Sequence, residues 1–277
     1  MAFVDKEKTD NPDKIGIIAG NGNFPILCAK EASKKGAKVI AIGIRGETEP
    51  LLEELADRFF WINLGELTKL IDCLKSEGVT KALMVGQIKH VSIFKQLSLD
   101  LKAISLMMKL NNKKADSLLG GVVKILEDEG IKILPSTTFL THLLPPKGIL
   151  TQKTPSKTIQ KDISFGTEIA KGIARLDIGQ TVVVKNRSVV AVEAMEGTDE
   201  TIKRAGIIGG KGIVVVKVSK PKQDIRFDVP VIGLKTIQTM ADACASAMAI
   251  DAEKTLFFDQ EEALSIANQH HICIMAQ

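Results

Sequence analysis

Side chains that could hold and cleave a phosphate group are concentrated between residues 175 and 233. Two groups of carboxylates flank a basic run in this stretch. The charged residues, in chain order, are Asp177, Glu193, Glu196, Asp199, Lys217, Lys220, Lys222, Asp224, Arg226 and Asp228. Carboxylates beside a basic run are suited to hold a divalent cation against phosphate oxygens. The pattern indicates hydrolysis or transfer at phosphorus, assisted by Mg²⁺.

Asp228 lies in an apolar context, between Phe227 and Val229, which predicts a partly buried carboxylate. A buried carboxylate needs a cation, and the candidates are Arg226, one of the nearby lysines or a metal ion. Asp228 is therefore the carboxylate most in need of a cation in this stretch. The alternative is an ion pair that serves only to hold the turn.

Glu193 and Glu196 would point to opposite faces if one strand ran through both. They converge only if the strand ends or bulges near Ala194. The alternative interpretation makes residues 197–200 a helix N-terminus, with Thr198 as N-cap and the acids offsetting the helix dipole. Glu193 and Glu196 fit that alternative less well, because carboxylates flanked by apolar residues are seldom buried without a partner.

The motif Gly20-Asn21-Gly22 follows a predicted buried strand and opens a helix, where backbone N–H groups can receive phosphate. Gln87 follows the fourth strand, at the edge where open α/β sheets bind ligands. A tight turn that needs glycine conformations explains the first motif equally well. A nicotinamide cofactor is disfavoured, because the third glycine of the dinucleotide fingerprint is missing and Arg45 stands where an acid would bind ribose.

The first half of the chain alternates predicted strands with single helices. Such alternation favours parallel strands joined by right-handed crossovers, which is a Rossmann-like, doubly wound α/β layer. The expected strands cover residues 14–19, 38–43, 58–62, 82–86 and 131–134, and the expected helices cover residues 26–35, 51–56, 65–76, 99–110 and 115–129.

A Pro- and Gly-rich stretch between residues 140 and 154 predicts a domain boundary. We place the N-terminal Rossmann-like domain at residues 1–143 and the catalytic domain at residues 144–277, where we expect a second α/β fold with a mixed sheet. Its predicted elements are a helix over 159–176, a hairpin over 181–193, a helix from about 198, a strand over 213–218, and alternating strands and helices from 231 to 275.

Composition excludes several functional classes. Of the 277 residues, 45% are hydrophobic and 25% are charged, which is typical of a globular protein with an ample core. A formal net charge of +4, the absence of Tyr and a single tryptophan argue against nucleic-acid binding. The four cysteines form no CxxC pair, which favours reduced thiols in a cytosol. Without a signal peptide or an apolar run of roughly 20 residues, we expect a cytoplasmic protein.

Seven motifs follow one another along nearly the whole chain. They are Ile17-Ile-Ala-Gly-Asn-Gly-Asn-Phe-Pro25, Gly86-Gln-Ile88, Ala115-Asp-Ser-Leu-Leu119, Ala174-Arg-Leu-Asp-Ile-Gly-Gln180, Ala191-Val-Glu-Ala-Met-Glu-Gly-Thr-Asp199, Lys220-Pro-Lys-Gln-Asp224 and Arg226-Phe-Asp-Val-Pro230. In these motifs and in their order the chain resembles the UDP-2,3-diacylglucosamine pyrophosphatases of the lipid A pathway, which are built from a Rossmann-like domain and a distinct C-terminal domain. The shared order is more specific than any single motif.

The resemblance implies Mg²⁺-dependent hydrolysis of the pyrophosphate bond in UDP-2,3-diacylglucosamine. Water would attack the phosphorus next to uridine. The products would be UMP and 2,3-diacylglucosamine 1-phosphate, which is lipid X. The family's essential aspartate falls on Asp228.

The resulting hypothesis makes Asp228 a metal ligand or the base that orients water. Further oxygens for Mg²⁺, or for Mn²⁺ in its place, would come from Glu193, Glu196 and Asp199. Lys220, Lys222 and Arg226 would neutralise the pyrophosphate as charge moves to the leaving group. The substrate-binding residues expected are Gly20, Asn21, Gly22, Gln87, Lys220, Asp177, Gln180 and Thr198.

The expected partner is an acylated UDP-sugar, with an apolar cleft for its acyl chains. The same hypothesis includes peripheral contact with the cytoplasmic face of the inner membrane and assembly into a homo-oligomer. It includes no binding of nucleic acid. Two rivals stay open. A nucleotide-sugar oxidoreductase using the N-terminal domain predicts saturable binding of NAD or NADP, and a non-catalytic binder of an acylated phospho-sugar predicts lipid X binding without UMP release.

Overall fold

The computed structural model describes residues 13–88, 99–109, 115–221 and 223–277. Two compact units make up the chain. The first comprises Met1–Phe139 with Ile225–Phe227, and the second comprises Leu140–Asp224 and Asp228–Gln277. Lys222, predicted as a catalytic residue, lies outside the described residues.

The first unit contains a five-stranded parallel sheet in the order β3-β2-β1-β4-β5. This order places the first strand at the centre and winds the chain outward in both directions, as the alternating pattern predicts. The strands are β1 (Lys14–Ala19), β2 (Lys38–Ile44), β3 (Arg58–Ile62), β4 (Lys81–Val85) and β5 (Lys132–Ile133).

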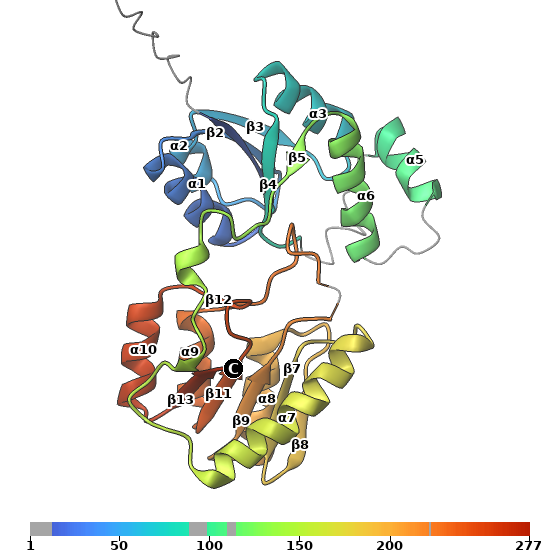
Figure 1. The fold of residues 1–277 in the computed structure, drawn as a ribbon. Helices are drawn as coiled ribbons and strands as arrows, with labels where there is room; N and C mark the ends of the chain where they lie inside the picture. Colours follow the sequence, from blue (N-terminus) through green and yellow to red (C-terminus); the bar gives the residue numbers. More distant parts are fainter. Residues whose placement is uncertain (1–12, 89–98, 110–114, 222) are drawn as a thin grey trace, which may run out of the picture. The chain divides into compact units, whose positions relative to one another are not determined.

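Helices cover both faces of this sheet, with α1 and α2 on one side and α3, α5 and α6 on the other (Figure 1). In α3 the apolar stripe of Leu67, Leu70, Ile71 and Leu74 is buried, as its helical spacing predicts. The helices are α1 (Phe24–Lys34), α2 (Leu51–Leu55), α3 (Leu67–Ser76), α5 (Leu101–Lys109) and α6 (Ala115–Asp128).

The second unit contains a six-stranded mixed sheet in the order β6-β13-β11-β9-β7-β8. Strands β9, β11 and β13 are parallel, whereas β7 runs antiparallel to β9 and to β8, and β6 runs antiparallel to β13. The strands are β6 (Gly148–Ile149), β7 (Thr181–Lys185), β8 (Ser188–Val192), β9 (Val214–Lys217), β11 (Ala247–Ile250) and β13 (Cys273–Ala276). The predicted α/β class, with a doubly wound parallel sheet and a second, mixed sheet, is confirmed.

Two apolar layers sandwich the mixed sheet, because side chains alternate along each strand. On β9, Val215 packs with one group of helices, whereas Val214 and Val216 pack against α7. Gly166 of α7 permits close approach, since a Cβ there would lie 2.8 Å from the Val216 side chain. The helices are α7 (Lys157–Arg175) on one face, and α8 (Thr198–Gly209), α9 (Leu234–Asp242) and α10 (Gln260–Gln269) on the other.

Smaller elements complete the second unit. Strands β10 (Val231–Ile232) and β12 (Leu256–Phe257) form a separate two-stranded parallel sheet. A short 3₁₀ helix, η1 (Thr141–Leu143), follows the division between Phe139 and Leu140. Among the described residues, no helix combines the length and the apolarity needed to cross a bilayer.

The β7–β8 hairpin turn is held by a carboxylate from α7. Asn186 and Arg187 have φ values of +50° and +57°, so the turn requires two left-handed residues. Their backbone N–H groups donate to the two carboxylate oxygens of Asp162, at 3.0 and 2.7 Å. Asp162 is buried, and these bonds account for a charge in an otherwise apolar layer.

Candidate active site

Polar residues gather at one edge of the mixed sheet. Lys217, the last residue of β9, lies opposite Thr181, the first residue of antiparallel β7, and opposite Ile250, the last residue of parallel β11. Residues that follow β8, β9 and β11 and those that precede β7 therefore emerge at the same edge. This is the carboxyl edge of the parallel strands, where α/β sheets commonly bind ligands.

A buried hydrogen-bonded chain lies at this edge. The Lys217 ammonium donates to the Thr198 hydroxyl at 2.7 Å, and that hydroxyl donates to Glu193 Oε1 at 2.8 Å. The second oxygen of Glu193 accepts the backbone N–H of Gln180 at 3.1 Å. Lys217 and Glu193 are only 5% and 7% exposed, so this is an internal charge pair joined through a threonine.

Burial lowers the pKa of Lys217, because removal from water disfavours the charged amine. The negative charges of Glu193, Asp199 and Asp228 oppose this effect and raise the pKa. Three carboxylates from different parts of the sequence therefore act on one ammonium group.

Asp228 forms a second charged group with Lys220 and Asp177. The Lys220 ammonium lies 3.1 Å from Asp177 Oδ1 and 3.4 Å from Asp228 Oδ2. Asp177 adopts a left-handed backbone conformation, with φ at +58°, just before β7. Of the cations proposed from the sequence for Asp228, the structure supplies a lysine, Lys220.

Several shielded polar atoms at this edge lack hydrogen-bond partners within the part of the chain that the structure describes. They are Gln180 Oε1, Ser219 Oγ, Gln223 Nε2 and Asp228 Oδ2. Shielded polar atoms of folded proteins are nearly always bonded, so such a group points to a ligand or to water. Asp228 Oδ2 is ion-paired with Lys220 and still has capacity to accept a hydrogen bond or to bind a cation.

The four carboxylates predicted as metal ligands are not brought together as one ligand set. Among the described residues there is no group of three or more His, Cys, Asp or Glu side chains that could hold a metal ion. The physical reason is that three of the four carboxylates accept hydrogen bonds from other groups of the protein. These three are Glu193, Glu196 and Asp199.

Glu196 points toward helix α8 and is exposed. It pairs with the Arg204 guanidinium at 2.6 Å and accepts the Ala194 backbone N–H at 3.0 Å. Hydrogen bonds, first among them one from its own backbone amide, lower the pKa of Glu196. The strand does end after Val192, but Glu196 does not converge with Glu193, which is committed to Thr198 and Gln180.

Asp199 is held by helix α9. Its Oδ1 accepts the Thr236 hydroxyl at 2.8 Å, and its Oδ2 lies 3.4 Å from the Lys235 ammonium. Thr198 is not the N-cap of α8, as the alternative interpretation of residues 197–200 would have it. Gly197 occupies that position, and the Thr198 hydroxyl is available to Lys217 and Glu193.

The glycine motif and Gln87 meet in the first unit. Asn21 and Gln87 form an antiparallel bridge. The backbone nitrogen of Asn21 lies 2.6 Å from the Gln87 carbonyl oxygen, and the backbone nitrogen of Gln87 lies 3.1 Å from the Asn21 carbonyl oxygen. A Cβ on Gly20 would lie 2.5 Å from the Gln87 carbonyl oxygen, so close backbone approach requires glycine there. The tight-turn interpretation therefore accounts for Gly20. Gly22 has φ at +91° and open space around it.

Arg226 belongs to the first unit, where its guanidinium pairs with Glu127 at 3.0 Å. The structure therefore groups Arg226 and Asp228 with different units, although they are two residues apart in sequence. The basic residue that the structure places beside Asp228 is Lys220.

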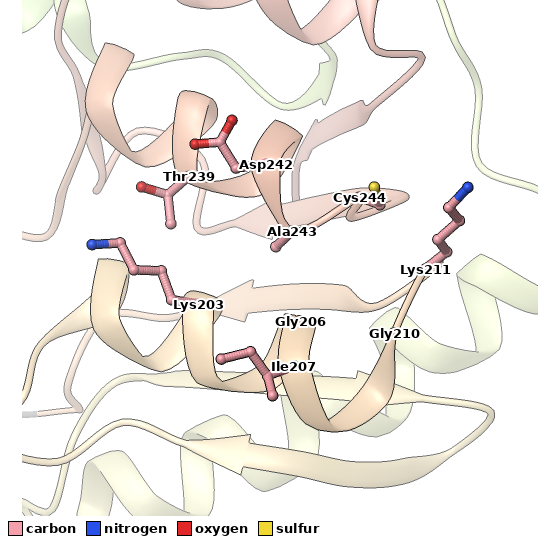
Figure 2. A pocket seen from close by; sticks show the side chains of 9 residues that line it. All are labelled: Lys203, Gly206, Ile207, Gly210, Lys211, Thr239, Asp242, Ala243 and Cys244. Carbon is pink, nitrogen blue, oxygen red and sulfur yellow. The ribbon is translucent and has the colours of Figure 1, made fainter.

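A pocket of about 400 Å³ lies between α8 and α9 (Figure 2). Its lining includes Lys203, Gly206, Asp242 and Cys244. Residues 210–211 precede β9, and Cys244 precedes β11, so this pocket opens at the amino edge of the parallel strands. It is therefore distinct from the polar carboxyl edge. The Lys203 ammonium is paired with Glu200 at 2.7 Å.

Sequence reasoning counted Lys217 in the basic run but gave it no role, and it did not assign Ser219 or Asp251 to the site. Asp251 follows β11, and its Oδ2 accepts the Ser219 backbone N–H at 2.7 Å. Lys217 closes a run of buried valines, and a lysine at the end of such a strand was a usable signal.

The fold and the polar edge define a two-unit α/β protein with a charged, incompletely satisfied site in its second unit. The chain belongs to the LpxI family: the family models for the LpxI N-terminal and C-terminal domains match residues 14–143 and 146–275. The UDP-2,3-diacylglucosamine pyrophosphatase LpxI of Caulobacter vibrioides is 30% identical over 268 residues, which cover 92% of this chain and 94% of that protein.

Solved structures give a weaker likeness. N5-carboxyaminoimidazole ribonucleotide synthetase from Thermotoga maritima is 23% identical, with 62% of this chain and 34% of that chain covered and a TM-score of 0.26. Phosphoribosylglycinamide synthetase from Anaerococcus prevotii is 12% identical, with 70% and 35% covered and a TM-score of 0.28. The chain thus spans about a third of each, and these TM-scores are too low to establish a common fold.

Proposed function

We propose that the chain hydrolyses the pyrophosphate bond of UDP-2,3-diacylglucosamine to UMP and 2,3-diacylglucosamine 1-phosphate in lipid A biosynthesis. Membership of the LpxI family and the name of the Caulobacter relative support this substrate. The structural observation that carries the proposal is Asp228 Oδ2, which is shielded, accepts no hydrogen bond from the described residues and lies beside the Lys220 ammonium. A carboxylate next to a cation is the minimum needed to position water against a diphosphate.

In the proposed reaction Asp228 accepts a proton from water as the water oxygen bonds to the phosphorus next to uridine. The bond between this phosphorus and the bridging oxygen breaks, and the bridging oxygen leaves with the acylated sugar phosphate. Lys220 stabilises the charge that develops on this leaving group. Shielded Gln180, Ser219 and Gln223 atoms are available to bond phosphate or sugar oxygens.

Mg²⁺, with Mn²⁺ as a substitute, is part of the proposal. Mg²⁺ in phosphoryl chemistry is usually held by one or two carboxylates together with substrate phosphates, not by an all-protein cage. Asp228, which retains capacity at Oδ2, fits that requirement. When bound, the ion would neutralise charge on the diphosphate and polarise its phosphorus–oxygen bonds. Glu193, Glu196 and Asp199 fit less well, since each is held by other donors.

Two further parts of the hypothesis concern partners. The acyl chains of the substrate reside in a bilayer, so we propose peripheral contact with the cytoplasmic face of the inner membrane. Helix α5 supports this contact, because Leu101, Ile104 and Met108 lie on one stripe and are 85%, 40% and 82% exposed.

We also propose that the chain forms a homo-oligomer. The direct measurement is the oligomeric state of the protein in solution.

The test is release of UMP from UDP-2,3-diacylglucosamine with Mg²⁺, with Mn²⁺ and with a chelator. We expect turnover with either metal and none with the chelator. Asp228→Asn should lower kcat by about 10²-fold or more, because the proton acceptor is lost. Glu200→Gln is the matched control: it removes an exposed carboxylate of the same unit and should retain activity.

Near-native turnover of Asp228→Asn would remove Asp228 from the mechanism. Lipid X binding without UMP release under any divalent metal would instead favour a non-catalytic binder. Saturable NAD or NADP binding would favour an oxidoreductase.

A further inference from the structure

A buried hydrogen-bonded chain holds the loop of residues 176–180, which joins α7 to β7. Glu193 Oε2 accepts the Gln180 backbone N–H at 3.1 Å, while Glu193 Oε1 accepts the Thr198 hydroxyl at 2.8 Å. The Lys217 ammonium donates to the same hydroxyl at 2.7 Å. Because Glu193 and Lys217 are both buried, this chain holds the end of the loop more firmly than an exposed contact would.

Gly179 brings the same loop against the backbone of Glu193. A Cβ at Gly179 would overlap the Glu193 carbonyl oxygen and would lie 2.8 Å from the carbonyl carbon. Both atoms belong to the backbone, so no side-chain rotation could relieve the overlap. The close approach therefore requires glycine at this position.

Asp177, at the other end of the loop, closes helix α7 in a conformation that glycine usually adopts. Its φ is +58°, which is the left-handed region common at helix C-termini. Its N–H donates to the Ala174 carbonyl oxygen at 3.2 Å, and the N–H of Ile178 donates to that of Ile173 at 3.2 Å. An aspartate is tolerated in this turn but is not required by it, so its charge needs another explanation.

The charge of Asp177 acts on Asp228 through Lys220. The Lys220 ammonium lies 3.1 Å from Asp177 Oδ1 and 3.4 Å from Asp228 Oδ2. The second distance is longer than a good hydrogen bond, and Asp228 Oδ2 accepts no hydrogen bond from the described residues. Asp177 therefore competes with Asp228 for the lysine, and this competition keeps Asp228 Oδ2 available to a ligand or to water.

We propose that the buried hydrogen-bonded chain and Gly179 position the loop for the proposed reaction, so that Asp177 draws Lys220 away from full contact with Asp228. Without this restraint the ammonium would close on Asp228 Oδ2 and displace the water that Asp228 is proposed to activate. The inference rests on the proposed function. It makes Glu193 a positioning residue, in place of the metal ligand expected from the sequence.

Thr198→Val tests the chain, because it removes the linking hydroxyl and keeps the shape of the side chain. Amide hydrogen exchange followed by NMR should show the Gln180 N–H exchanging at least about tenfold faster than in the wild type, since its acceptor is no longer fixed. Thr198→Ser restores a hydroxyl and should return the exchange rate toward the wild-type value. Circular dichroism establishes that each variant is folded. An unchanged Gln180 exchange rate in folded Thr198→Val would overturn the anchoring.

Gly179→Ala tests the same anchoring without removing a polar group, and it replaces Thr198→Val if that variant does not fold. The added methyl group must displace the loop from the Glu193 carbonyl. Exchange of the Gln180 N–H should become about tenfold faster, and kcat for UMP release should fall about tenfold or more. Gly172→Ala is the matched control, since a Cβ at Gly172 of α7 meets no atom within 4 Å. Equal behaviour of the two alanine variants would overturn the role of Gly179.

A double-mutant cycle separates positioning of Lys220 from a general loosening of the fold. Asp177→Asn removes the charge and keeps a residue that tolerates the left-handed conformation. It should lower kcat about tenfold or more with little change in KM, because substrate contacts remain. Combined with Thr198→Val, it should lower kcat no further than the worse single variant, because both changes act through the same contact to Lys220. Multiplication of the two single effects would overturn the proposal.

The exchange measurements do not use hydrolysis. Absence of UMP release by the wild-type protein would overturn the proposed function and the kinetic part of this inference with it. The exchange rate of the Gln180 N–H would still decide whether the buried chain anchors the loop.

Discussion

Lys220 is the residue on which the electrostatics of the Asp228 group depend. Its ammonium is paired with both Asp177 and Asp228, and it is mostly shielded, with 22% of the side chain exposed. An ion pair of this kind costs more to break than an exposed one, because the remaining charges are left partly desolvated. Its loss should therefore affect both the position of Asp228 and the charge available to the diphosphate.

Lys220→Met should lower kcat for UMP release by about 10²-fold, since a cation aimed at developing charge is removed. Steady-state kinetics at saturating metal measure this effect. Lys235→Met is the matched control, because Lys235 pairs with Asp199 but is 82% exposed and contributes little. Equal kinetics for the two variants would contradict the role given to Lys220.

At the residue scale, the sequence predicted that Asp228 needs a cation as its partner. It did not predict which groups pair with the other carboxylates. The apolar neighbours of Asp228 were informative, and the partner proved to be Lys220. Glu196 and Asp199 were not separable from Glu193 by sequence, because their partners Arg204 and Thr236 are set by helix packing. Tertiary contacts decide which carboxylates remain available.

At the element scale, the β7–β8 hairpin is joined to α7 by one buried carboxylate. Asp162 accepts both turn N–H groups, and the turn residues Asn186 and Arg187 are left-handed. Glu193 directly follows the last residue of this hairpin, and its N–H donates to the Thr181 carbonyl at 2.9 Å, so the register of the hairpin sets where Glu193 lies relative to Lys217. Stability of the turn and geometry of the polar edge are therefore coupled.

Asp162→Ala should lower the free energy of unfolding by about 1–3 kcal/mol, because two turn N–H groups lose hydrogen bonds to a charged acceptor. Urea unfolding monitored by circular dichroism measures this change. Glu168→Ala, an exposed carboxylate on the same helix, is the control and should change stability little. A loss below a few tenths of a kcal/mol for Asp162→Ala would show that water satisfies the turn.

The elements themselves were largely predictable. Hydrophobic periodicity located α3 and the strands of the first sheet, and the hairpin was expected from two valine runs separated by Lys185-Asn186-Arg187. The helix predicted over residues 159–176 forms over Lys157–Arg175, beginning two residues earlier because Ser156 caps it. Helix α8 begins where expected, but with Gly197 at the cap. Local chemistry determines such boundaries, whereas side-chain partners across elements are invisible in sequence.

At the scale of the whole molecule, each unit has its own hydrophobic core. In the first unit Glu129, which follows α6, pairs with Lys75 of α3 and Lys102 of α5. The hydrogen bond from Lys102, followed by that from Lys75, lowers the pKa of Glu129 from 4.5 to about 2. Three helices of this unit are thus linked through one carboxylate.

Because the folded pKa is depressed, the contribution of Glu129 is complete above pH 4.5 and is lost as the pH falls toward about 2. Glu129→Gln should lower the urea midpoint of the first unit at pH 7, and the difference from wild type should shrink between pH 4.5 and pH 2. Trp61, the single tryptophan, lies in β3 and reports on this unit by fluorescence.

Asp72→Asn, an exposed substitution on α3, is the control for that pH series. It should show a smaller effect at pH 7 and no narrowing that follows the Glu129 titration. A difference between Glu129→Gln and wild type that stayed constant from pH 7 to pH 2 would assign the effect to packing and not to charge.

The fold class of both units followed from the order of elements in the sequence, but one long-range feature did not. Ile225–Phe227 belong to the first unit, although the chain on either side belongs to the second. Phe227 packs with the core of the first sheet, and the Ile225 carbonyl accepts the Ser136 backbone N–H at 2.9 Å. A segment of three residues is too short for its sequence pattern to predict the unit with which it packs.

The assignment of Ile225–Phe227 to the first unit limits how the two units can be exchanged between related proteins. A cut at the junction between Phe139 and Leu140 would give a second fragment that still carries a piece of the other fragment's interior. A hybrid joining this second half to a foreign first half would import Phe227 into a core that did not evolve around it. Any exchange of the first unit should therefore keep the residues around Phe227, and Asp228 follows directly on Phe227 in the sequence.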